Sequence, residues 1–84
     1  MIENQDIQKL QNELARLRDQ HLNGTVDTAD LWEVMQQASS LLDQARGSRF
    51  EDVLDVILNL LNSIWSNHRN QQKLQHLKSV AANF

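Results

Sequence analysis

The sequence predicts an all-α protein of three helices, at about residues 3–22, 28–46 and 49–82, joined by short turns. Only two glycines and no proline occur among the 84 residues, so little of the chain is suited to turns or loops. Long runs rich in Leu, Gln, Glu and Ala favour helix over strand. Apolar residues recur every three or four positions in each segment, which is the helical period. We expect a helical hairpin followed by a long third helix.

The first predicted helix, residues 3–22, has an apolar seam of the coiled-coil type. Its apolar residues are spaced three and four apart and therefore share one face: Ile7, Leu10, Leu14 and Leu17. The helix is expected to end at Asn23-Gly24, because both residue types accept the left-handed conformation that follows many helices.

The second predicted helix begins after Asp27, a residue type that caps helix N-termini. Val26 and Leu31 stand five apart, which is the spacing of a hydrophobic staple around that cap. The apolar positions form one stripe at helical spacing: Leu31, Val34, Met35, Ala38, Leu41, Leu42 and Ala45. Gly47 is the expected terminator.

The third predicted helix begins at a capping box, Ser48-Arg49-Phe50-Glu51. In this motif the serine hydroxyl accepts from the amide of Glu51 while the Glu51 side chain accepts from the serine amide. The turn before this helix is then only two or three residues long. Such a turn makes the second and third helices antiparallel neighbours or forces them to cross sharply.

Residues 50–65 carry apolar side chains around most of the helix circumference. One narrow polar stripe interrupts them: Asp52, Asp55, Asn59, Asn62 and Ser66. This pattern predicts a helix that is buried on nearly every side but one. Two shorter helices can cover one broad face of it, so the remaining apolar surface should contact a partner.

Residues 66–84 form a polar, locally basic extension of the third helix within a single domain, 1–84. Seven acids against two arginines lie in residues 23–65, whereas the extension carries basic residues and no acid. Residues 66–72 contain no aliphatic side chain, so the helix either crosses solvent there or breaks. A continuous helix over 49–82 would be about 50 Å long and would extend past the other two.

Small size favours self-association. A chain of 84 residues buries only about 60% of the surface that its unfolded form exposes. With no cysteine for disulfides and no cluster of metal ligands, the remaining aids to stability are tight helix packing and oligomerisation. We therefore expect an oligomeric helical bundle.

The composition predicts a soluble, cytoplasmic protein without membrane contact. The absence of cysteine is compatible with a reducing compartment. The first twenty residues mix charges with leucines and do not resemble a signal peptide. The most apolar stretch, 53–65, is shorter than the roughly 20 residues that span a bilayer.

Nothing in the sequence predicts an enzyme, a cofactor or a metal site. The three histidines lack a second ligand three or four residues away: His21, His68 and His76. Glu51, Asp52 and Asp55 lie in the first turns of a helix, where negative charge is favoured by the helix dipole, so general acid–base chemistry is not needed to explain them. No glycine-rich phosphate loop is present.

Residues 7–45, with their heptad helix, Asn23-Gly24 turn and second amphipathic helix, resemble the small helical-hairpin co-chaperones of type III secretion systems. The resemblance implies a two-helix hairpin that binds other proteins. The long apolar third helix departs from that pattern. Small phage or plasmid regulators look similar at this level.

Two functions follow as hypotheses. The first is a non-enzymatic adaptor, inhibitor or co-chaperone that binds itself or another helical protein through apolar helix packing. Its predicted interface is Leu54, Leu58, Leu61, Trp65, Leu74, Leu77 and Val80. The second is a small regulator that dimerises through the third helix and binds nucleic acid through the basic C-terminal part of that helix. Its predicted phosphate contacts are Arg69, Lys73 and Lys78.

Overall fold

The computed structural model describes residues 2–82, and within them the chain forms three α-helices and no strand. These are α1 (Asn4–Leu22), α2 (Thr28–Ala45) and α3 (Glu51–Ala82). The predicted all-α class and the three helices are confirmed. The last two residues of the predicted extension, 83 and 84, lie outside the described part.

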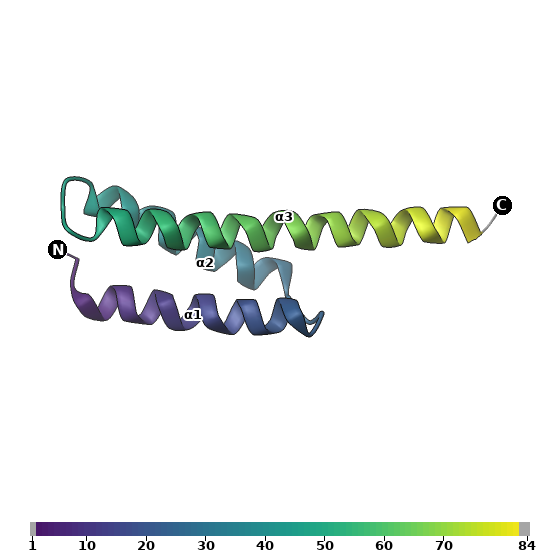
Figure 1. The fold of residues 1–84 in the computed structure, drawn as a ribbon, viewed down its shortest axis with the longest axis horizontal. Coiled ribbons are helices and arrows are strands. Elements are labelled where there is room, and N and C mark those ends of the chain that lie inside the picture. The colour runs from purple at the N-terminus through teal and green to yellow at the C-terminus, as the bar shows by residue number, and fades with distance from the viewer. Residues whose placement is uncertain (1, 83–84) are drawn as a thin grey trace.

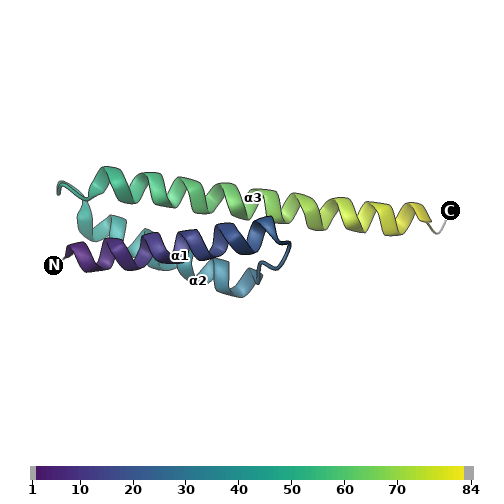
Figure 2. The ribbon, with the colours of Figure 1, turned by 60° about the horizontal axis from the view of Figure 1, so that its bottom comes forward.

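The three helices pack side by side, and each helix runs antiparallel to the one before it in the chain (Figure 1). α2 runs back along α1, and α3 reverses direction again, so α1 and α3 point the same way and both contact α2 and each other (Figure 2). α3 is much longer than the other two helices and continues past them at its C-terminal end. The molecule is accordingly elongated, 56 Å along its longest axis and 20 Å or less across it.

The turn between α1 and α2 forms as its residue types predict. Gly24 has a left-handed backbone (φ 71°), and the amide of Thr25 donates to the carbonyl of Gln20 at 2.8 Å. The amide of Gly24 donates to His21, which completes a Schellman motif. Asp27 then caps α2, because its carboxylate accepts from the amides of the second and third helical residues.

The predicted capping box of α3 does not form, and α3 begins at Glu51 rather than 49. Ser48 accepts from the amide of Phe50 at 3.2 Å, while the Glu51 carboxylate accepts from the amide of Gly47 at 2.8 Å. The turn spans residues 46–50 because α2 ends at Ala45 and Gly47 adopts a left-handed backbone (φ 81°). Each side chain thus bonds an amide one position earlier than the box requires.

The core lies between the three helices and contains only apolar side chains. Its buried members are Ile7, Leu10, Leu17, Leu31, Val34, Met35, Ala38, Leu42, Ala45, Leu54, Ile57, Leu61 and Ile64. The predicted apolar faces of α1 and α2 are therefore the faces that pack, with Leu14 and Leu41 partly buried at their margins. α3 is one unbroken helix through residues 66–72, which resolves the alternative that the sequence left open.

A charged cluster joins α1 to α2 at the surface beside this core. The guanidinium of Arg16 donates to both carboxylate oxygens of Asp30, at 2.5 and 3.0 Å, and also to Glu13 on its own helix. The hydrogen bonds from Arg16 lower the pKa of Asp30 below its ordinary value of 3.8, because they favour the ionised carboxylate. The pKa of Arg16 is raised by the same contacts, so it stays charged.

Adjacent leucines on α3 provide a matched test of which face is buried. Leu61 is 0% exposed and Leu60 is 48% exposed. We expect Leu61→Ala to lower the free energy of unfolding by about 2–5 kcal/mol, because it removes buried methyl groups and leaves a cavity. Leu60→Ala should change it by about 0.5 kcal/mol or less in the monomer. Urea unfolding of dilute protein measures both, and equal losses would contradict the packing.

The Arg16–Asp30 pair should make stability depend on acid pH. A carboxylate whose pKa is lower in the folded state stabilises the protein above its unfolded pKa, near 3.8, and this contribution is lost as the pH falls through the folded value. Asp30→Asn should therefore reduce stability at pH 7 and flatten its decline below pH 4. Both side chains are at least one-third exposed, so the loss should not exceed about 1 kcal/mol.

The control for that measurement is Asp43→Asn. Asp43 also belongs to α2, but it is largely exposed and makes a single long contact to Arg46 (3.7 Å). Urea midpoints from pH 7 to pH 2 that change equally in the two variants would show that the Arg16 pair has no specific effect.

Candidate interaction surface

The C-terminal part of α3 is not buried by any other helix, and only Gln71, Gln72 and Gln75 lie beside the α1–α2 turn, where they line a hollow. Every residue from 69 to 82 is exposed, whereas the preceding turns of the helix contact α1 and α2. At 1.5 Å per residue this overhang is about 21 Å long. In Figures 1 and 2 it projects beyond the α1–α2 turn as a single helix.

The overhang carries three large apolar side chains in water. Leu74 is 53% exposed, Leu77 is 62% exposed and Val80 is 39% exposed. An isolated helix of this length is only marginally stable in water, since most helix stability in proteins comes from packing of an apolar face. The overhang is therefore the part of the fold that the chain itself does not support.

The four interface residues predicted in the first half of α3 differ in how deeply they are buried. Leu54 and Leu61 are fully buried against α1 and α2, so they belong to the core and have no surface to offer a partner. Leu58 and Trp65 are partly buried on the flank of the helix. The reason is geometric: α1 and α2 both pack on the face that includes Leu54, Ile57, Leu61 and Ile64.

Two apolar residues that were not predicted as interface residues are exposed in this half of α3. Val56 is 56% exposed and Leu60 is nearly as exposed, and Val53 lies at the margin of the core beside them. The expectation of a helix buried on nearly every side is therefore wrong for the monomer. The spacing of Val53, Val56 and Leu60, three and then four residues, was visible in the sequence, but nothing there showed which apolar face the other helices would cover.

The two tryptophans pack against each other across α2 and α3. Trp32 and Trp65 have ring centroids 5.6 Å apart and planes tilted by 47°. Aromatic pairs at this separation stabilise a fold by about 0.5–1.5 kcal/mol beyond the area they bury. Trp65 thus has an intramolecular partner, although Trp32 keeps half of its surface exposed.

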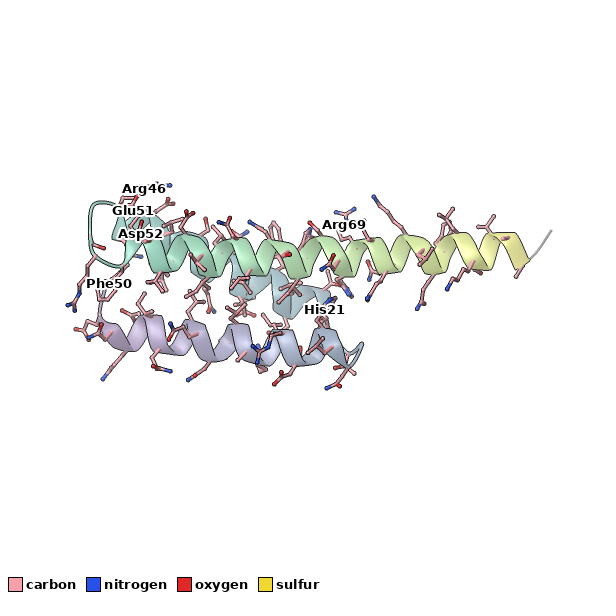
Figure 3. The ribbon with its side chains drawn as sticks, in the orientation of Figure 1. His21, Arg46, Phe50, Glu51, Asp52 and Arg69 are labelled. Atoms are coloured by element: carbon pink, nitrogen blue, oxygen red, sulfur yellow. The ribbon has the colours of Figure 1, made fainter. Side chains whose placement is uncertain are left out.

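The predicted phosphate contacts do not share one face of α3. Arg69 and Lys73 are one turn apart, but Lys78 is five residues further on and so about 140° around the helix from Lys73. Figure 3 shows Arg69 on the overhang, away from α1 and α2. Three cations spread around a helix do not make a continuous basic patch.

Other polar side chains of α3 have partners within the molecule. His68 Nε2 lies 2.9 Å from the Thr28 hydroxyl and 3.2 Å from the Gln72 amide nitrogen, beside a hollow that His21 also lines. Glu51 and Asp52 lie at the start of α3 next to Arg46, as Figure 3 shows, and Glu51 approaches Arg46 at 4.0 Å. Among residues 2–82 no group of three potential ligands is placed to hold a metal ion.

No helix within residues 2–82 is long and apolar enough to cross a membrane. Comparison with known proteins finds no family model, no curated protein and no solved structure that matches this chain.

The difference in support along α3 should appear in hydrogen exchange. In protein dilute enough to be monomeric, amides of residues 69–82 should exchange much faster than those of residues 54–64, because the overhang can fray without breaking core contacts. Mass spectrometry of peptic fragments measures this. Equal protection of the two segments in a monomer would contradict the conclusion that packing against α1 and α2 does not stabilise the overhang.

Proposed function

We propose that this protein is a non-enzymatic helical interaction module of the adaptor, inhibitor or co-chaperone type. Its binding surface is the exposed apolar side of α3, which runs from Val56 and Leu60 to Leu74 and Leu77 on the overhang. The observation that carries the proposal is the unsupported overhang, in which large apolar side chains project on a lone helix.

The apolar area and the residue spacing of this surface favour a helical partner. Burying apolar area contributes about 25 cal/mol per Å², so four half-exposed aliphatic side chains on one helix are a substantial driving force for association. Knobs-into-holes packing of another helix is the arrangement that aligns with residues repeating every three and four positions. The same contact would stabilise the overhang.

The alternative function is nucleic-acid binding through the basic residues of α3, and two observations weigh against it. Lys78 lies on a different side of α3 from Arg69 and Lys73, and the chain carries a net charge of −3. Both features weaken attraction to a polyanion.

A photo-cross-linking residue tests the surface without knowledge of the partner. Benzoylphenylalanine at position 60 should give discrete cross-linked adducts in the cells of the source organism, because Leu60 lies on the exposed apolar side. The matched control is position 62, since Asn62 is also exposed but lies on the opposite side of α3 from Leu60. The mass of each adduct tells whether the partner is another copy or a different protein.

Adducts at position 60 and not at position 62 are the expected result. Absence of adducts at both positions, or the same adducts at both, would overturn the proposed function.

A further inference from the structure

We propose that the partner of α3 is a second copy of this chain, paired antiparallel to it about a two-fold axis close to Asn67. This inference rests on the proposed function and names the occupant of its surface. In the pair, the overhang of each copy lies along the α1–α2–α3 body of the other.

The spacing along the exposed side of α3 is that of a coiled-coil seam. Apolar residues occupy its first part, at Val53, Val56 and Leu60. The alternation of three and four residues then continues without interruption through a polar part: Ser63, Asn67 and Asn70. Except for Val53, which is partly buried, all these side chains are exposed. A seam that keeps this period turns toward one partner along its length.

The last part of the seam is apolar again, at Leu74, Leu77 and Ala81, and all three are exposed. The order of the seam is therefore apolar, polar, apolar, with Asn67 at its midpoint. A seam with this symmetry is complementary to its own reverse, which is what an isologous interface about a two-fold axis perpendicular to the helix requires.

Antiparallel pairing about Asn67 places apolar residues of one copy against apolar residues of the other, and polar against polar. Val56 of one copy lies opposite Leu77 of the other, and Leu60 lies opposite Leu74. The polar residues of the middle part face each other, so an Asn67 amide can bond its counterpart across the axis. Polar residues at the centre of a seam select one register, because any shift would place polar side chains against leucines.

Charge complementarity selects antiparallel over parallel pairing. The first turns of α3 carry Glu51, Asp52 and Asp55, whereas residues 66–82 carry three cations and no acid. A parallel pair would align acid with acid and base with base. The antiparallel pair aligns the acidic half of each helix with the basic half of the other, which favours this orientation and fixes partner choice.

The same arrangement gives each overhang a neighbour. The overhang of one copy covers Val56 and Leu60 of the other, and packs as a fourth helix on its three-helix body. In a parallel pair the two overhangs would pack only on each other, and each would remain exposed on its other sides. The antiparallel arrangement therefore gives each overhang a packed body as its neighbour, whereas a parallel arrangement gives it only a second overhang.

Engineered cysteines test the orientation, since the chain has none of its own. Val56→Cys and Leu77→Cys are prepared separately, one of them isotope-labelled, and oxidised in a glutathione buffer alone and mixed. Antiparallel pairing brings the two sites within disulfide range only between different variants. We expect a cross-linked dimer of one labelled and one unlabelled chain in the mixture and none in either variant alone.

Other outcomes are decisive. Cross-linking within each variant alone would show parallel pairing and overturn the inference. A mixture of Asn62→Cys with Leu77→Cys is the control for random collision, because Asn62 is off the seam, and equal cross-linking there would also overturn it.

Light scattering of the unmodified protein separates this inference from the proposed function. We expect a mass of twice 9.7 kDa, falling to 9.7 kDa in Leu60→Glu but not in Asn62→Glu. A monomer at all concentrations would overturn self-pairing. The proposed function would then stand only if cross-linking at position 60 captures a different protein, and it would fail with no adduct at all.

Discussion

The structure depends on the burial of one face of α3 between α1 and α2. Leu54 and Leu61 have no exposed surface, and the buried residues of both shorter helices point at this face. A chain of this size without disulfides has few other sources of stability. Which face was buried decides which apolar side chains in the first half of α3 stay exposed.

Burial of that face determines what remains outside. α1 and α2 have 19 and 18 residues and α3 has 32, so two short helices cannot cover the whole length of the third. The uncovered part includes both the far side of the first half of α3 and the whole overhang. A symmetric pair would cover both regions with a single contact, because each overhang would lie on the region that the partner's body leaves open.

Several details of the fold could be predicted from residues that are close together in the sequence. The Asp27 cap, the left-handed Gly24 and the apolar faces of α1 and α2 all depend on residues within one or two turns of each other. The start of α3 did not follow, although it is also local. Left-handed Gly47 displaced the turn, and Ser48 and Glu51 each bonded a different amide from the one the motif predicts.

The sequence by itself determined the helices, their number and the apolar period of α3, because backbone propensity and side-chain spacing act within a few residues. It also displayed the continuous three-and-four spacing from Val53 to Ala81. Only the tertiary structure decided that Leu54 and Leu61 are core while Val56 and Leu60 are surface. Both faces of α3 are apolar, so either could have been buried. The choice depends on where α1 and α2 pack, and helix packing joins residues distant in sequence.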